Sequence, residues 1–522
     1  MPSSRDADVI VVGAGNAGFC AALAAAERGA RVMMLEKAPE DWVGGNSYFT
    51  AGAIRSVHGG LEDVLSLVEP IEAERVQATE LDAYSAEDFR RDMRRLTEGR
   101  ADPDLVDVLV ADSRDTLGWL ADRGIALRLM YDRQSYTVEG RHVFWGGLHV
   151  GTVDGGHGLI EAHRRAAARA GIELRTGHAM TGLVERDGTV EGVRCRGDAS
   201  GRSLETYSPA VVVAAGGFEA DPRRRALYLG PNWDVAKVRG TPYNTGEALD
   251  AMLAAGAVPY GHWSGCHSIA WDASAPATGD RTLTNRLSRQ SYPLGVVVNR
   301  DGERFLDEGA DFRNYTYARY GAEILRQPGS IAFQLFDAQT APLLRADEYE
   351  SPGVSRLEAR SVAELADALG IDRVRLERTV ARFNDAVNDE RFDPTVKDGK
   401  RTRDLAPPKS NWALPLSEPP FLGFPVTCGI TFTFGGVRVD QESRVLHRAG
   451  RPIPGLHAAG ELVGGLFFHN YPGGTGLMSG AVFGRRAGAS AAAFAARGGS
   501  AHPPRRRDIH PLNERSREES RP

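Results

Sequence analysis

The sequence has few of the features that mark secreted, metal-binding or membrane proteins. Of its 522 residues only four are cysteines, Cys20, Cys195, Cys266 and Cys428, and no two of them form a C-x-x-C pair. Such scattered cysteines provide neither a disulfide framework nor a metal site, so we expect reduced thiols in a cytoplasmic protein. No apolar run approaches the ~20 residues of a membrane-spanning helix. The first eight residues are too short and polar for a signal peptide, so we also expect no membrane insertion.

An excess of charge of one sign is also missing. The chain has 63 Lys and Arg residues against 69 Asp and Glu residues, a net charge of −6, which gives no reason to expect nucleic-acid binding. The hydrophobic fraction of 42% is ordinary for a globular protein. The length allows two or more domains, each with its own core.

The opening stretch, residues 9–37, has the order of a dinucleotide-binding unit: VIVVGAGNAGFCAALAAAERGARVMMLEK. An apolar β-branched run predicts a buried strand, and Gly13, Gly15 and Gly18 complete G-x-G-x-x-G at the turn into a helix. A second apolar strand ends at Glu36, whose carboxylate is placed to accept hydrogen bonds from a ribose. The acid favours FAD or NAD over NADP, and the alternative is a glycine-rich turn that binds nothing.

The chain divides by composition into a split domain and an insertion. Glycine-rich, buried strands are found before residue 260 and after residue 428, whereas aromatic residues, prolines and loops are frequent between them. We expect an α/β fold in which 1–260 and 429–497 form a Rossmann-like domain and 261–428 form an inserted α+β domain. Residues 498–522 mix basic, acidic and proline residues without periodicity, which predicts a disordered tail.

Shorter patterns predict individual elements. The apolar segments 172–175, 180–186 and 189–194 are separated by turn residues, which predicts an antiparallel β-meander beside the parallel sheet. Helical periodicity predicts further helices at 158–169, 245–257, 359–370, 372–388 and 476–494.

Several segments together resemble the FAD-dependent fumarate reductases and the succinate dehydrogenase flavoproteins. They cover residue 8 to about residue 497 and are the opening unit, GGNS at 44–47, AAGGF at 214–218, TGEALDAMLAAGA at 245–257, VVNRDGERFLDE at 297–308, AAGEL at 458–462 and YPGGTGLMSGAVFGRRAG at 471–488. Within that superfamily the chain is most similar to tricarballylate dehydrogenase; 3-ketosteroid Δ1-dehydrogenases and urocanate reductases also belong to the group. The resemblance implies an FAD domain built from both chain ends, a mobile capping domain, and a substrate between them.

The resemblance also implies which residues contact FAD. Succinate dehydrogenases attach FAD through a histidine near the GGNS loop, but Ser47, Tyr48 and Phe49 occupy that neighbourhood here, so we expect non-covalent FAD. The alternative for the later glycines is tight helix packing. The implied FAD-binding residues are Gly13, Gly15, Asn16, Ala17, Gly18, Glu36, Lys37, Gly44, Gly45, Asn46, Ser47, Thr50, Ala51, Gly52, Ala179, Ala214, Ala215, Gly216, Glu461, Gly474, Thr475, Gly476 and Leu477.

The same resemblance implies hydride transfer at a C–C bond and points to candidates for its reacting residues. His267 matches the family's substrate histidine, with a polar surface histidine as the alternative. Arg313 lies one residue beyond the family's proton-transfer arginine, and its alternative is a salt bridge to Asp311 or Glu308. His469 is a further catalytic candidate. Weaker polar candidates are Arg55, Tyr243, Arg281 and Arg286.

Two positions depart from the fumarate reductases. Phe432 replaces a carboxylate-binding histidine, and Tyr471 replaces an arginine. A buried carboxylate that lost both partners would lose several kcal/mol of hydrogen bonding, so fumarate itself is not the expected substrate. Y-P-G also occurs in ketosteroid dehydrogenases, so Tyr471 either polarises a substrate oxygen or packs on the flavin.

These observations leave several functions open. The leading hypothesis is desaturation, or its reverse, beside the carboxylate or carbonyl of a small acid or ketone, with a tricarballylate-like acid preferred although few cations surround the expected site. The alternatives are a 3-ketosteroid-type desaturase, a fumarate reductase-like enoate reductase, and a flavin electron carrier without a substrate of its own. No heme or iron–sulfur motif and no second dinucleotide unit is present, so the electron acceptor stays unidentified.

Overall fold

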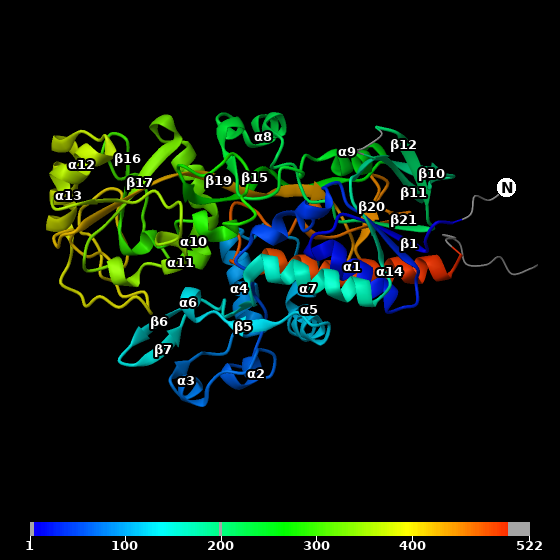
Figure 1. Ribbon diagram of the computed structural model, residues 1–522, viewed down its shortest axis with the longest axis horizontal. Helices are drawn as coiled ribbons and strands as arrows, with labels where there is room; N and C mark the ends of the chain where they lie inside the picture. Colours follow the sequence, from blue (N-terminus) through cyan, green and yellow to red (C-terminus); the bar gives the residue numbers. More distant parts are fainter. Residues whose placement is uncertain (1–4, 198–200, 499–522) are drawn as a thin grey trace, which may run out of the picture.

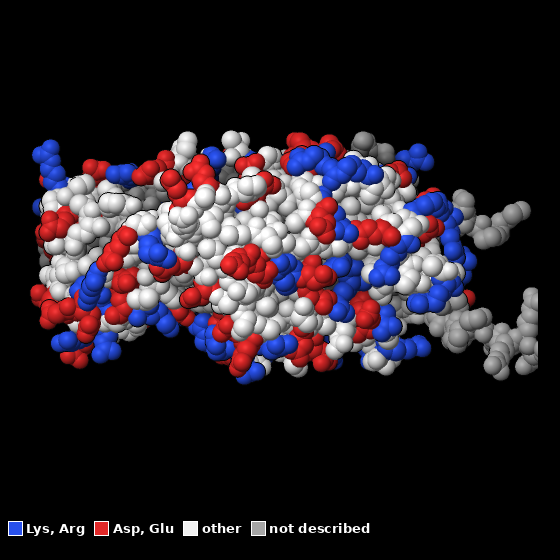
Figure 2. All heavy atoms as spheres, turned by 90° about the horizontal axis from the view of Figure 1, so that it is seen from below, with Lys and Arg blue, Asp and Glu red and all other residues white. Residues whose placement is uncertain are grey.

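The computed structural model describes residues 5–197 and 201–498 and shows an elongated molecule with a sheet toward each end (Figure 1). The predicted tail therefore lies outside the described residues, except for Gly498. None of the helices in the described ranges is both long and apolar enough to cross a membrane. Basic and acidic side chains are interspersed over the face seen in Figure 2, in keeping with the small net charge.

The first sheet is assembled from both ends of the chain, as predicted. Its six strands run in the order β20-β21-β13-β1-β2-β9 and are parallel except for β20. Every residue of β1, β2 and β13 is buried, which explains their apolar, largely β-branched sequences. The strands are β1 (Val9–Val12), β2 (Val32–Leu35), β9 (Glu173–Arg175), β13 (Ala210–Val213), β20 (Arg444–Leu446) and β21 (Pro452–Ala458).

Helices α1 (Asn16–Ala26) and α14 (Thr475–Ala496) pack against each other beside this sheet (Figure 1). Glycine permits their close approach, because a Cβ on Gly488 would lie 2.0 Å from the main-chain oxygen of Ala21. Both helices begin at the same edge of the sheet, where the parallel strands end. This edge is the expected place for a ligand in a fold of this kind.

The meander prediction is correct for its later strands and wrong for its first. β10 (His178–Arg186), β11 (Thr189–Gly197) and β12 (Ser203–Tyr207) form an antiparallel sheet. The segment 172–175, in contrast, contributes β9 to the main sheet, where it pairs in parallel with β2. A short apolar strand fits either sheet, and the free edge of β2 decides its partner.

The second sheet contains β14 (Lys237–Val238), β19 (Phe421–Val437), β17 (Ile331–Phe336) and β16 (Val296–Asn299), and β15 (Pro259–Asp272) and β18 (Leu357–Ala359) also pair with β19. The predicted boundaries at 260/261 and 428/429 both fall inside the long strands β15 and β19, so this division stays a prediction. Figure 1 shows these two strands running along the molecule between its two ends. Helices α10 (Arg313–Leu325), α11 (Ala346–Tyr349), α12 (Val362–Leu369) and α13 (Arg373–Ala386) belong to this half.

Residues 61–150 form a lobe that extends below the rest of the molecule in Figure 1. It contains α2 (Leu61–Leu65), α3 (Ala73–Gln77), α4 (Ala86–Leu96), α5 (Pro103–Asp122), α6 (Tyr131–Gln134) and the hairpin β6 (Ser135–Val138) and β7 (Arg141–Phe144). Figure 1 shows α6 and this hairpin below α11. The remaining larger helices are α7 (Gly155–Arg169), α8 (Pro222–Leu229) and α9 (Glu247–Ala254).

Candidate active site

A cavity that is open to solvent connects the edge of the first sheet with the second sheet, and its empty volume, the open part included, is about 1840 Å³. One end is lined by the glycine turn after β1 and by Glu36, and the other end by His267, Arg313 and Tyr471. We call these the cofactor end and the substrate end. The cavity therefore joins the residues of the opening motif to residues more than 400 positions further along the chain.

Glycine is required at the turn after β1. Gly13 has a φ of +99°, and a Cβ on it would lie 2.3 Å from the main-chain oxygen of Ala214. Gly15 precedes α1 without a side-chain cap, so the first N–H groups of this helix are free to bind an anion. One exception is the N–H of Asn16, which donates to Ser47 Oγ at 3.2 Å and so draws the loop 44–47 against the turn.

The acid at the end of β2 is ready to accept ribose hydroxyl groups. Its Oε2 accepts from the N–H of Ala14 at 2.7 Å and its Oε1 from the N–H of Ala38 at 2.8 Å, which leaves each oxygen a free lone pair. Burial raises the pKa of Glu36, against the opposing effect of these N–H donors. Next to it, Lys37 pairs with Glu247 at 2.9 Å.

Most residues predicted to bind FAD line this cavity. They are Gly13, Gly15, Asn16, Ala17, Glu36, Lys37, Gly45, Asn46, Ser47, Thr50, Ala51, Ala214, Ala215, Gly216, Glu461, Gly474, Gly476 and Leu477. Gly18, Gly44, Gly52, Ala179 and Thr475 are absent from its lining. The residues on either side of Ala179 on β10 line the cavity instead, because successive residues of a strand point to opposite faces.

The start of α14 forms another part of the wall. Gly474 has a φ of +82° and caps the helix. Thr475 is fully buried, and its Oγ1 has no hydrogen-bond partner in the described structure. Thr475 does not line the cavity, so the groups that this helix start offers to a ligand are the uncapped main-chain N–H groups beside Gly474 and Gly476.

At the substrate end, His267 is surrounded by aromatic rings. It is only 1% exposed, and in the described structure neither ring nitrogen has a partner. The ring of Phe432 is stacked on it with 5.2 Å between the ring centroids, and the rings of Tyr317 and Tyr471 form T-shaped contacts with centroid distances of 5.0 and 5.1 Å. Burial and the charge of Arg239 lower the pKa of His267 well below 6.5, so the imidazole is neutral and has a donor and an acceptor to offer.

Tyr317 is a site residue that the sequence analysis missed. Its hydroxyl oxygen lies 2.6 Å from that of Tyr471, and both residues line the cavity. Burial raises the pKa of Tyr471 well above 10, so it stays a neutral phenol. Tyr317 follows Arg313 by one helical turn on α10, and this i, i+4 spacing was the signal available in the sequence.

The cavity also holds more positive charge than the sequence led us to expect. Arg313 donates to Gln290 Oε1 at 2.8 Å, and Arg239, another missed residue, donates from Nε to Asn285 Oδ1 at 3.1 Å. Their further acceptors are the hydroxyl of Thr431 and a main-chain oxygen, so every partner is neutral. Burial lowers the pKa of both, that of Arg313 to about 9, yet both guanidinium groups remain charged at neutral pH.

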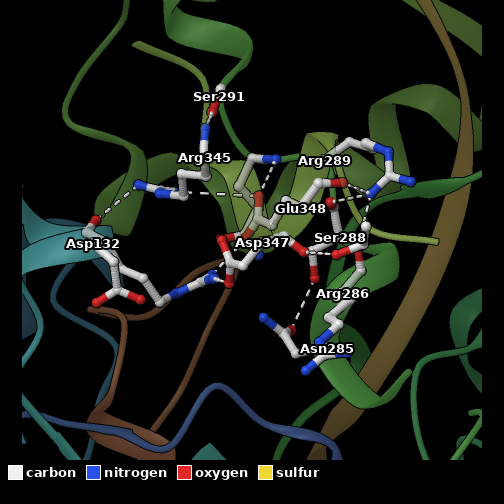
Figure 3. Close-up of polar contacts among 12 residues, drawn as sticks. Asp132, Asn285, Arg286, Ser288, Arg289, Ser291, Arg345, Asp347 and Glu348 are labelled. Carbon is white, nitrogen blue, oxygen red and sulfur yellow. Dashed lines mark hydrogen bonds and ion pairs between the residues drawn. The ribbon is translucent and has the colours of Figure 1, made fainter. Parts of the chain in front are cut away.

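Arg313 is also hydrogen bonded to Arg133, which belongs to a buried network of charged residues. Arg133, which also lines the cavity, accepts from Arg313 Nη2 at 3.1 Å through its main-chain oxygen. Its guanidinium pairs with Asp347 and Glu348, each at 2.5 Å. Figure 3 shows these two acids between Arg345 and Arg289. Arg133 thus forms salt bridges with α11, whereas neither Arg313 nor Arg239 has a salt-bridge partner among the described residues.

Other predicted residues lie elsewhere. His469 is outside the cavity, with a side chain 37% exposed and its ring 4.6 Å from that of His262, so the structure gives it no contact with the reacting end. Arg55 is buried and donates to the main-chain oxygen of Gly473. Arg281 stacks over Tyr48. Tyr243 lines the cofactor end, and Arg286 is not part of the lining.

Comparison with known proteins agrees with this geometry. Residues 8–477 match the model of the FAD binding domain family. A fumarate reductase (cytochrome) from Shewanella frigidimarina is 30% identical over 489 residues, 93% of this chain and 77% of the relative. A 3-oxosteroid 1-dehydrogenase from Mycobacterium tuberculosis is 26% identical, with 92% and 96% covered. The open conformation of a flavocytochrome c3 fumarate reductase has a TM-score of 0.70 and 28% identity, covering 95% of this chain and 79% of that one.

The residues of the cofactor end fit the cofactor of these relatives. The glycine turn leaves room for a pyrophosphate, the buried acid after β2 can bind a ribose, and α14 begins at the cavity without a side-chain cap. The predictions of fold class, superfamily, FAD and enzymatic activity are thereby confirmed. The chain belongs to the FAD binding domain family and is an FAD-dependent oxidoreductase of the fumarate reductase and succinate dehydrogenase flavoprotein superfamily, acting on C–C bonds.

Proposed function

We propose that the enzyme desaturates a C–C bond beside a carboxylate, or reduces the corresponding double bond, and that its substrate is a tricarballylate-like acid. The observation that carries this proposal is the pair Arg239 and Arg313, which are buried in the cavity and have only neutral hydrogen-bond partners. A buried charge is normally paired with its opposite. A carboxylate substrate would supply that partner, and guanidinium groups bind carboxylates with two parallel hydrogen bonds.

The roles of the residues follow from their surroundings. Bound FAD supplies the acceptor or donor of the hydride. Arg239 and Arg313 hold carboxylate groups, and the neutral His267 donates a hydrogen bond to the same substrate. Burial brings the pKa of Arg313 down to about 9, which makes its proton easier to exchange than that of a free arginine and suits it to proton transfer at the second carbon. The aromatic wall of Phe432 and Tyr471 excludes water on the other side.

A second function is favoured by a different observation. The hydroxyl groups of Tyr317 and Tyr471 lie 2.6 Å apart in the cavity, and one of them can donate to a substrate carbonyl. Such a pair suits the desaturation of a ketone, and a 3-oxosteroid 1-dehydrogenase is among the relatives. The uncompensated arginines weigh against an uncharged ketone, which would leave both charges buried without a partner.

Anaerobic mixing of the yellow holoenzyme with candidate substrates tests the proposal. We expect tricarballylate to bleach the flavin absorbance, because its carboxylates would pair with the positive charges of Arg239 and Arg313. Reduced enzyme should in turn be reoxidised by the unsaturated tricarboxylate, and a 3-ketosteroid should leave the flavin oxidised. Bleaching by the ketosteroid alone would replace the carboxylate proposal with the ketone alternative.

A further inference from the structure

The side chain of Asn46 connects its loop at the cofactor end to the segment that contains Arg239. Its Oδ1 accepts from the N–H of Thr241 at 2.8 Å, and its Nδ2 donates to the main-chain oxygen of Thr431 at 2.5 Å. Nδ2 also donates to Glu219 Oε1 at 2.6 Å. Both N–H groups of the amide are therefore used within the protein, and the side chain of Asn46 has no donor left for FAD.

The loop and the segment are in close contact at this point. A Cβ on Gly240 would lie 2.1 Å from Asn46 Oδ1 and would displace the amide. On the other side of the loop, the hydroxyl of Ser47 accepts from the N–H of Asn16 at the start of α1. Asn46 thus lies between the turn that is free to bind an anion and the segment that carries an arginine of the substrate end.

Arg239 needs support from its neighbours because it is buried without a counter-ion. Its side chain is held by Asn285 and by the hydroxyl of Thr431, and its N–H donates to the main-chain oxygen of Ile430 at 2.8 Å. A guanidinium forms two parallel hydrogen bonds with a carboxylate only when it is aligned, and a displacement of ~1 Å can lower a rate roughly 100-fold. Thr431 and Thr241, on two sides of Arg239, are both hydrogen bonded to Asn46.

We propose that Asn46 is a positioning residue for Arg239, and that it connects the loop at the cofactor end to the binding of a substrate carboxylate. The inference rests on the proposed function, because it requires that Arg239 binds such a carboxylate. Without the amide of Asn46, Arg239 would keep its charge and its place in the cavity wall. Its guanidinium would no longer be held in the direction of the substrate.

Asn46→Leu tests the proposal because leucine has nearly the shape of asparagine and forms none of these hydrogen bonds. The unsaturated tricarboxylate cis-aconitate does not reduce oxidised flavin, so calorimetric titration of the oxidised holoenzyme gives its Kd without turnover. We expect this Kd to rise about tenfold, as for the loss of roughly one hydrogen bond. The KM for tricarballylate should rise with it, while kcat should change by less than about threefold.

A double-mutant cycle separates this role from a general structural one. Because Asn46 acts through Arg239, Asn46→Leu should not change the Kd further when Arg239→Gln is already present. The flavin absorbance of each variant shows that FAD is still bound.

Asn384→Leu is the matched control. The amide of Asn384 also joins a main-chain N–H and a main-chain oxygen, both of Leu416, but Asn384 does not line the cavity. This variant should unfold at a lower temperature and bind cis-aconitate with the wild-type Kd.

An equal rise in Kd with and without Arg239→Gln would overturn the proposal, and so would an unchanged Kd in Asn46→Leu. If Arg239→Gln alone leaves the Kd unchanged, the proposed function fails as well, because Arg239 then binds no carboxylate. If Asn46→Leu does not fold or does not hold FAD, Thr431→Val replaces it. Valine removes the hydroxyl that accepts from Arg239 and keeps the main-chain oxygen that accepts from Asn46. Thr431→Val should raise the Kd in the wild-type protein only, and a rise in Arg239→Gln as well would contradict the proposal.

Discussion

The two ends of one cavity are built in different ways. The cofactor end is built largely from glycines and main-chain N–H groups, many of them in the neighbouring stretches 9–37 and 44–47, whereas the substrate end uses side chains from widely separated segments. Main-chain recognition tolerates little change, because an added Cβ meets backbone. Side-chain recognition changes with a single substitution, as Phe432 and Tyr471 illustrate. This contrast explains how relatives with one cofactor act on fumarate and on 3-oxosteroids.

The largest effect should come from adding a methyl group at the cofactor end. In Gly13→Ala the new Cβ would lie 2.3 Å from the oxygen of Ala214, where the main chain must shift. We expect the purified protein to be colourless and less stable by roughly 3 kcal/mol. The flavin absorbance of the purified protein measures bound FAD, and the midpoint of urea unfolding measures the loss of stability.

Gly29→Ala is the matched control for that substitution. Gly29 also has a positive φ, +80°, but a Cβ there would have no atom within 4 Å. The strain of the left-handed backbone should cost about 1 kcal/mol and leave FAD bound. If both variants lose FAD equally, glycine is required at position 13 because of backbone strain at positive φ, and not because a Cβ would contact Ala214.

The next largest effect should come from a substitution that weakens substrate binding and leaves FAD binding unchanged. Arg239→Gln removes a charge that has only neutral partners, so we expect the stability without substrate to be unchanged or higher. Loss of a charge-assisted pair with a carboxylate should lower kcat/KM by roughly 30- to 1000-fold, with FAD still bound. Steady-state kinetics and flavin absorbance check these points. The exposed Arg223→Gln serves as control, and an unchanged kcat/KM in Arg239→Gln would remove the basis of the carboxylate proposal.

The difference between the two ends also decided what the sequence could predict. The cofactor end could be predicted from the sequence because Gly13, Gly15 and Glu36 belong to one continuous motif, and the spacing of that motif reflects the strand–turn–helix geometry. Arg239 belongs to no recognisable motif. It lies at the cavity because the preceding strand, β14, pairs with β19. Arg133 reaches it only through the contact of its lobe with α11.

His469, a catalytic candidate from the sequence, lies outside the cavity although it is only two residues from Tyr471. Its backbone has a φ of +60°, and the N–H of Asn470 donates to the oxygen of Phe468 in a tight turn. This turn leaves His469 exposed while Tyr471 is buried. The two neighbouring side chains point to different surroundings, because side-chain direction depends on local backbone torsions that no motif in the sequence specified.

The smallest expected effect distinguishes the two proposed substrate classes. Tyr471→Phe removes one hydroxyl of the pair with Tyr317 and leaves both arginines in place, so we expect kcat with a carboxylate substrate to fall only about tenfold, as for the loss of roughly one hydrogen bond. Stopped-flow measurement of flavin reduction gives this rate, and Tyr317→Phe is the control that removes the other hydroxyl. A larger loss in Tyr471→Phe than in Arg239→Gln would reverse the ranking, since the phenol rather than the guanidinium would then hold the reacting oxygen, as the ketone alternative requires.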